Sequence, residues 1–278
     1  MQKRKAAMAK TDKNDIVKPE GGALAMPDFG AFAGMGFENQ TSQDMAIPFL
    51  AVLQALSPQV QESDPTYIPG AKPGDLINTV TGELIQRPAT FVPCYTEHVY
   101  VEWVPRDAGG GFVAVHGYNS EVVVSAKAKA EKFNELKTPE GNDLIETFYV
   151  YGLLLDAPDA QSSSTPIVIA FTSTKIKVYK ALMTKLRTIK GNPPLFAFRL
   201  AITSVDAKNK KNQPYKNFKI TPVGATLFDS ANLPGTPFAG LLEEGKALVE
   251  AIKGGLARAA VESQAPSREP GADEEEPF

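Results

Sequence analysis

The feature that most constrains this chain is one strong helix pattern set between segments that alternate like strands. The helix pattern lies in residues 173–191, where apolar side chains recur every three or four positions: Ile176, Tyr179, Met183 and Leu186. Ser173 or Thr174 can cap its start, and Gly191 can end it. A chain of several strands, one helix and then more strands has few compact arrangements open to it.

Strand patterns stand on both sides of this helix. In residues 89–105, the alternation places Val99, Val101 and Trp103 on one face and His98, Tyr100 and Glu102 on the other. Three glycines at 109–111 predict a hairpin into residues 112–118. Further strands are predicted in residues 146–155, 167–174, 195–205 and 215–223.

Shorter patterns fill in the rest of the chain. Residues 47–58 predict a helix, because Ile47, Leu50, Leu53 and Leu56 have helical spacing between two prolines. Residues 74–85 predict two strands around a tight turn at Thr81-Gly82. A charged helical insertion is expected around 126–137, and a short amphipathic helix within 241–261.

This order of elements is typical of a mainly β protein with an OB-fold, a five-stranded Greek-key barrel with its helix between strands 3 and 4. We therefore expect four regions: a flexible N-terminal arm (1–45), the OB-fold domain (46–230), a short helical extension (231–260) and a disordered acidic tail (261–278). In such barrels, ligands are held at the loops between strands 1 and 2 and between strands 4 and 5.

Charge is distributed unevenly along the chain. The net charge of the whole chain is only −3, yet residues 175–219 hold twelve Lys and Arg against the single acid Asp206. Residues 262–278 hold six acids against Arg268, and the chain ends in DEEEPF. A basic block beside an acidic tail is typical of a protein that binds an anionic partner.

The sequence offers little for catalysis. The two histidines, His98 and His116, lie in no recognisable nucleophile arrangement. With Cys94 they fall short of the four ligands of a structural zinc site, so we expect no metal and no cofactor. We expect a protein that is not an enzyme.

Binding has more support, because aromatic and basic side chains are interleaved around the last two strands. Alternation places Arg199, Tyr215 and Lys219 on one side of that hairpin, with the lysines of the intervening loop close by. Bases can stack on an aromatic ring while phosphates meet the cations, which is how single strands are gripped. The predicted nucleic-acid-binding residues are Lys175, Lys177, Arg199, Lys208, Lys210, Lys211, Tyr215, Lys216, Lys219, Tyr149 and Tyr151.

Several aromatic residues have a competing interpretation as core. Phe196, Phe198 and Phe218 are expected inside the barrel, and Trp103 and Tyr179 are favoured as core. Phe148 lies on the face opposite Tyr149 and Tyr151, and alternation alone leaves open which of these two faces could carry bases.

The core layout, with STKIKVYKALMTKL before the last hairpin and PYKNFKI closing it, resembles tailed-phage single-stranded DNA-binding proteins. The ending GADEEEPF is similar to the tail of bacterial single-stranded DNA-binding proteins, although Glu276 stands where those have an apolar residue. The resemblance implies a protein that coats and protects single-stranded DNA in replication and recombination. Its tail would recruit partner proteins and could compete with DNA, through residues Asp273, Glu274, Glu275, Glu276, Pro277 and Phe278.

Two other functions stay open on the sequence: a recombination or strand-annealing protein that uses the same basic surface, and a virion or scaffold protein that binds no DNA. Self-association stays open for the single-strand binder and for the strand-annealing protein. No apolar stretch in the sequence is long enough for a membrane span, and no export signal is evident, so we expect a cytoplasmic protein, in the host cytoplasm if viral.

Overall fold

The computed structural model describes residues 46–130, 135–156, 164–209, 211–224 and 239–263. The predicted N-terminal arm, the six tail residues from Asp273 to Phe278 and Lys210 lie outside these residues. The strands are β1 (Ala46–Ile47), β2 (Leu50–Val52), β3 (Leu76–Asn78), β4 (Leu84–Ile85), β5 (Ala89–Trp103), β6 (Phe112–Gly117), β7 (Asp143–Leu155), β8 (Ser164–Thr172), β9 (Leu200–Lys208), β10 (Pro214–Pro222) and β11 (Arg258–Ala259). The α-helices are α1 (Glu121–Lys129), α2 (Ile176–Arg187) and α4 (Ala239–Lys253).

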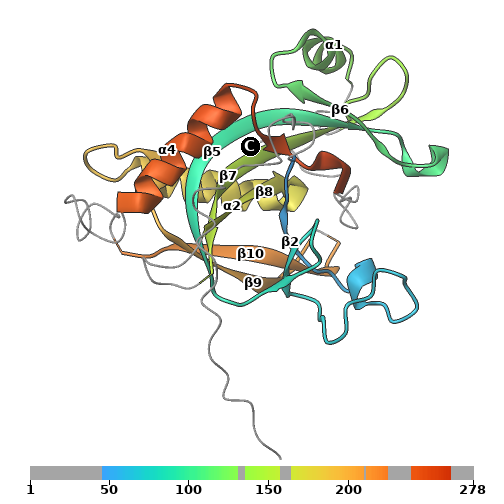
Figure 1. The fold of residues 1–278 in the computed structure, drawn as a ribbon. Helices are drawn as coiled ribbons and strands as arrows, with labels where there is room; N and C mark the ends of the chain where they lie inside the picture. The colour runs from blue at the N-terminus through green and yellow to red at the C-terminus, as the bar shows by residue number, and fades with distance from the viewer. Residues whose placement is uncertain (1–45, 131–134, 157–163, 210, 225–238, 264–278) are drawn as a thin grey trace, which may run out of the picture. The chain divides into compact units, whose positions relative to one another are not determined.

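Six antiparallel strands form the main sheet (Figure 1). Their order is β10-β9-β5-β7-β8, with β6 beside the second half of β5. The chain is therefore mainly β, as predicted, and α2 follows the strand β8 and precedes β9. Within the described residues no sheet closes into a barrel, because β8 and β10 end the strand order and do not pair. The predicted closed five-stranded barrel is thus not confirmed.

The long strand β5 bends and joins two parts of the sheet. Its register against β7 shifts between Pro93 and Tyr95, which marks a bulge. Before the bulge β5 pairs with β9, and after it the same edge pairs with β6. The predicted hairpin at the three glycines is confirmed, since Gly109, Gly110 and Gly111 all have positive φ angles between β5 and β6.

The segment 46–54 lies across the gap between the sheet's two end strands. At β8, the N–H of Val168 donates to the carbonyl of Pro48 at 2.9 Å. At β10, the Gln54 side chain donates to the carbonyl of Lys216 and accepts from its N–H, both at 2.8 Å. The prediction of a helix over 47–58 is wrong. Residues 46–47 and 50–52 instead form the strands β1 and β2. Strand pairing and the burial of their apolar side chains outweigh the helical spacing of the sequence.

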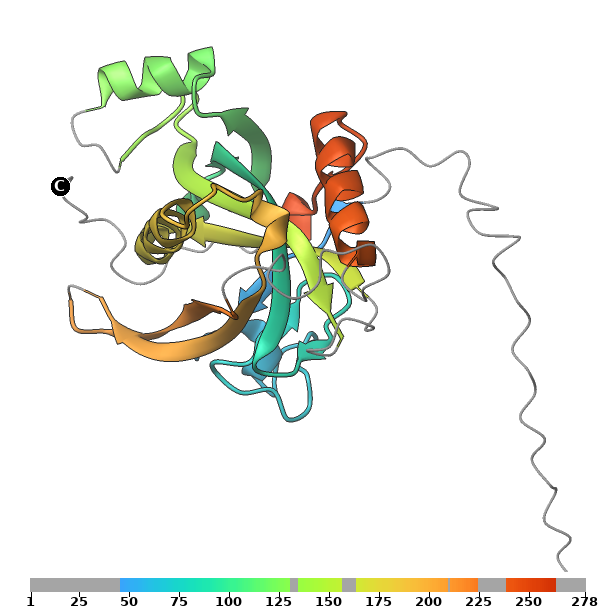
Figure 2. The same ribbon diagram turned by 90° about the vertical axis from the view of Figure 1, so that its left-hand side faces the viewer.

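Apolar side chains cover both faces of the main sheet. One face packs against α2, which buries Leu182 and Leu186, and the other packs against Leu241, Leu248 and Ile252 of α4. Figure 2 shows α2 and α4 on opposite sides of the sheet. Each such side chain, fully buried, stabilises the fold by about 1.5–3 kcal/mol. The predicted face of Val99, Val101 and Trp103 is confirmed, because all three lie in the core cluster on the α4 side.

Several element boundaries differ from the predictions. Helix α1 begins at Glu121, earlier than expected, and the Ser120 hydroxyl caps it by accepting from the N–H of Val123. Strand β9 begins at Leu200 and extends into the predicted loop, while residues Leu195–Ala197 form a 3-10 turn. Phe196 therefore leaves the predicted row and packs toward α4, whereas Phe198 is buried on the α2 side.

Candidate nucleic-acid interface

The hairpin of β9 and β10 carries part of the predicted interface. Lys219 pairs across the strands with Thr203, and Tyr215 pairs with Ala207, so the two residues share one face. Lys219 is exposed and Tyr215 is half-buried. Arg199 lies just before β9, and its carbonyl accepts from the N–H of Val223 beyond β10. The predicted grouping of Tyr215 and Lys219 is present in the hairpin.

The opposite face of the same hairpin holds Lys216. Its register partner is Asp206, and the two side chains form an ion pair. Asp206 is the single acid of the basic block in the sequence. This ion pair compensates the charge of Lys216, whose backbone is already held by Gln54. Lys216, although predicted at the interface, is thus half-buried and already paired with an acid.

The tip of the hairpin is a short turn with exposed lysines. Lys208 ends β9 and is exposed, and Lys211 is exposed in the turn. Asn209 and Gln213 close the turn through two backbone N–H bonds and a side-chain bond of 2.8 Å. The loop is shorter than predicted because both strands extend into it. These hydrogen bonds close the end of the hairpin, where Lys208 and Lys211 are exposed.

Helix α2 places more cations beside the hairpin. The predicted apolar face is confirmed, since Ile176, Leu182 and Leu186 are buried and Tyr179 and Met183 are partly buried. Lys177 is exposed in the first turn, and Lys175 lies in the 3-10 turn before it. In both ribbon views α2 lies between α1 and the β9–β10 hairpin (Figures 1 and 2). Hence the cations of α2 and of the hairpin belong to neighbouring elements.

Tyr149 and Tyr151 do not join this surface. Both are buried in β7, with 1 % and 3 % of their surface exposed. The Tyr151 hydroxyl donates to Glu97 at 2.7 Å. Burial is the larger cause that raises the pKa of both tyrosines, and the negative charge of Glu97 adds to it. Because a base cannot reach a buried ring, the structure corrects the assignment of these two residues to the interface.

A column of stacked rings, which includes Phe148, lies on the other side of α2. Tyr118 stacks on His98 with centroids 5.2 Å apart, and His98 stacks on Phe148 at 4.2 Å. Phe148 in turn stacks on Tyr179 of α2 at 4.5 Å. The four residues come from β5, β7, α2 and the turn after β6, so no periodicity in the sequence connects them. We call these four rings the aromatic column.

Charged groups surround the aromatic column. Nε2 of His98 lies 2.8 Å from a carboxylate oxygen of Glu146. Burial raises the pKa of Glu146, but the bond to His98 and the charges of His98, Lys180 and Lys127 outweigh this effect and leave the pKa below its usual range. Lys127 of α1 also lies 4.6 Å from the centre of the neighbouring Tyr100 ring. Lysines of α1 and α2 thus both lower the pKa of Glu146 beside the aromatic column.

Cys94, His98 and His116 each have surroundings that differ from those of a metal ligand. Cys94 is buried, and burial raises the pKa of its thiol to about 12. His98 pairs with Glu146, and His116 pairs with Glu102 at 2.6 Å. No group of three His, Cys, Asp or Glu side chains in the described part of the chain could hold a metal ion.

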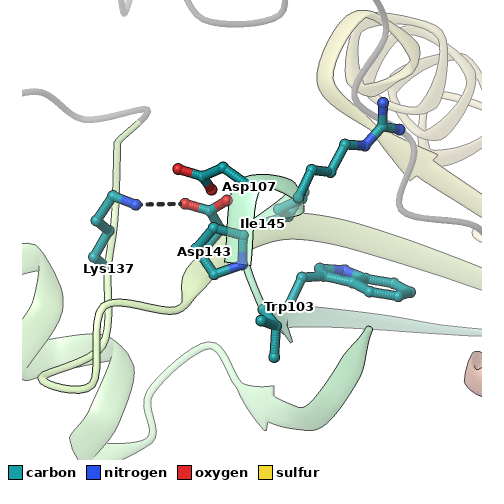
Figure 3. A pocket seen from close by; sticks show the side chains of 8 residues that line it. Trp103, Asp107, Lys137, Asp143 and Ile145 are labelled. Carbon is teal, nitrogen blue, oxygen red and sulfur yellow. Dashed lines mark hydrogen bonds and ion pairs between the residues drawn. The ribbon is translucent and has the colours of Figure 1, made fainter. Parts of the chain in front are cut away.

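A pocket where β5 ends and β7 begins is lined by two acidic and two basic side chains, Asp107, Asp143, Arg106 and Lys137 (Figure 3). Lys137 forms an ion pair of 2.9 Å with Asp143, and Asp107 points toward the same space. Trp103 lines the wall but is only 6 % exposed and packs edge-on against Phe112, which confirms it as a core residue. The paired charges make this pocket a poor site for phosphate.

The helices that the structure describes all fall short of the length and apolar character that a bilayer crossing requires.

The chain is similar to a known protein family. The Pam3 phage gp34-like protein family matches residues 18–258. No curated protein and no solved structure matches. Because the match covers most of the chain and the whole main sheet, this chain belongs to the Pam3 phage gp34-like protein family.

Proposed function

We propose that this protein binds single-stranded DNA without catalysis, and coats and protects it during phage replication or recombination. The observation that carries the proposal is the set of exposed cations on α2 and the β9–β10 hairpin, together with Tyr215 on the face of Lys219. Lysines attract phosphates along a strand, and Tyr215, beside Lys219 on the hairpin face turned away from α2, offers a stacking partner for a base.

The strand order also supports this proposal. The long strand β5, then β7 and β8, then α2, then β9 and β10 follow the order of an OB-fold, here with its sheet left open between β8 and β10. In that comparison the β9–β10 hairpin corresponds to strands 4 and 5, whose loop contacts nucleic acid in OB-folds. We interpret the domain as an open variant of that architecture.

The acidic tail has a separate proposed role. Its residues, Asp273 to Phe278, would recruit replication or recombination proteins, with the terminal aromatic entering an apolar pocket of the partner. The same charges can compete with DNA for the basic surface. Because Glu276 replaces an apolar residue of the bacterial pattern, the partner we propose is a phage protein.

A mobility-shift assay with a labelled oligo-dT and a duplex of equal length, each at two salt concentrations, tests the function. The expected result is a preference for the single strand that weakens as salt rises. Replacing Lys208 and Lys211 by alanine should weaken binding, whereas replacing Lys72 and Lys246, exposed lysines on other elements, should not.

Other outcomes of the assay would identify a different function. Equal affinity for the two DNAs contradicts a single-strand binder. Complete lack of binding favours the virion or scaffold alternative. If the protein instead accelerates pairing of two complementary strands, the strand-annealing function replaces the one proposed here.

A further inference from the structure

We infer that the aromatic column is a second DNA contact, in which a base stacks on the outer face of Tyr118 between α1 and α2. This inference rests on the proposed function and names where a base is held. It concerns a site separate from the β9–β10 hairpin, and it includes Phe148, from one of the two faces of its strand that alternation left open for bases.

The inner end of the column is fixed in the core. Phe148 is 9 % exposed, and Tyr179 contacts the fully buried Phe171 with ring centres 5.6 Å apart. The planes of Tyr179 and Phe148 are within 21° of parallel, and those of Phe148 and His98 within 17°. A ring stack anchored in this way is held in place before any ligand arrives, so binding orders little of the protein.

The outer end of the column is open. Tyr118 stacks on His98 with planes only 7° apart, yet 49 % of the tyrosine is exposed. One face of its ring is therefore covered and the rest is available. A column that served only to fill the core would be covered at both ends, as it is at its inner end, where Tyr179 packs against the fully buried Phe171. A flat apolar ring added to the open face would continue the stack, and a nucleobase has this shape.

The charges near the column suit a nucleic acid strand. Nζ of Lys127 in α1 lies 4.6 Å from the centre of the Tyr100 ring, and both Lys127 and Lys180 of α2 lower the pKa of Glu146 beside His98, so cations of two elements lie near the column. Lys180 is exposed on the same helix as Lys177. A strand with a base on Tyr118 can thus continue along α2 toward the β9–β10 hairpin, since α2 lies between α1 and the hairpin (Figure 2). The two contacts would bind one strand.

The test compares two oligonucleotides of equal length, oligo-dT and a strand whose bases are replaced by abasic sites. Four proteins are titrated with each: the full chain, Tyr118→Ala, Tyr118→Trp and the control Tyr67→Ala. Tyr67 is a partly exposed tyrosine outside the column. On oligo-dT, Tyr118→Ala should bind about tenfold more weakly, whereas Tyr118→Trp and the control should match the full chain. On the abasic strand all four should bind alike.

Cross-linking gives an independent readout. Oligonucleotides carrying 5-iododeoxyuridine, irradiated in complex with the full chain, should cross-link within the peptide that contains Tyr118. If Tyr118→Ala loses nothing on oligo-dT, or loses as much on the abasic strand, the inference is wrong while the proposed function stands. If the full chain fails to bind oligo-dT at all, the proposed function fails and the inference fails with it.

Discussion

At the scale of single residues, Gly152 shows how closely the strands of the main sheet approach one another. It lies in β7 opposite Pro93, beside the bulge of β5. A Cβ atom at this position would lie 2.3 Å from the carbonyl oxygen of Val92 and 2.4 Å from the ring of Phe91. Both neighbours belong to the core, so neither can move cheaply. Glycine is thus required here by contact, and its φ angle has no part in the requirement.

Replacing Gly152 by alanine should destabilise the protein by about 3 kcal/mol, at the upper end of overpacking costs, because backbone and an aromatic ring must both shift. Urea unfolding followed by the fluorescence of the single tryptophan, Trp103, measures the free energy of unfolding. Gly117→Ala is the matched control, since a Cβ atom there meets nothing within 4 Å. Equal stability of the two variants would contradict this account of the close contact between β5 and β7.

At the scale of elements, alternation and turn residues predicted much of the sheet. The faces of β5, the glycine hairpin and the apolar side of α2 follow from local spacing, which the fold preserves. The structure of segment 47–58 could not be predicted in this way, because the segment contacts two strand edges that are far away in the sequence. Residues joined only by the tertiary fold give no local pattern, and the aromatic column is the same case.

The site was predictable to a similar degree. The grouping of Tyr215 with Lys219 needed only the pairing of two adjacent strands. The burial of Tyr149 and Tyr151 could not be read from β7, where both faces are apolar or aromatic. It depends on α4 and on Phe49, whose ring lies 5.5 Å from that of Tyr149, covering the α4 side of the sheet.

The link between segment 46–54 and β10 gives a prediction at this scale. Gln54→Ala removes two hydrogen bonds to the backbone of Lys216 and leaves its N–H and carbonyl unpaired. We expect a loss of about 1–3 kcal/mol in the free energy of unfolding and faster hydrogen exchange at the Lys216 amide. Gln61→Ala, which removes one exposed bond to Ala55, should cost less. Unchanged exchange at Lys216 would mean that Gln54 does not hold this edge.

At the scale of the whole molecule, the charge of the chain is polarised. Twelve cations lie between Lys175 and Lys219, and six acids lie between Glu262 and the C-terminus. The chain is packed onto the folded domain as far as β11, which pairs with β1 in a separate two-stranded sheet, and Val261 is buried just beyond it. Nine residues of sequence then separate Ser263 from Asp273, the first of four consecutive acids.

Deleting residues 270–278 should therefore raise the affinity for oligo-dT at low salt, because the deleted carboxylates no longer compete with phosphates for the cations. The difference should shrink at high salt, where charge interactions are screened. Fluorescence anisotropy at two salt concentrations measures both effects. A control in which Asp273 to Glu276 become Asn and Gln should behave like the deletion. Identical binding by full and shortened chains would contradict competition by the tail.

The central claim is that exposed lysines of the β9–β10 hairpin bind phosphates of a single strand. The most direct measurement is the slope of log K against log salt for oligo-dT, in the full chain and in the Lys208→Ala/Lys211→Ala variant. If each lysine holds one phosphate, the slope should become shallower by about 0.7 per lysine. An unchanged slope in the variant would contradict the claim, whatever the affinity.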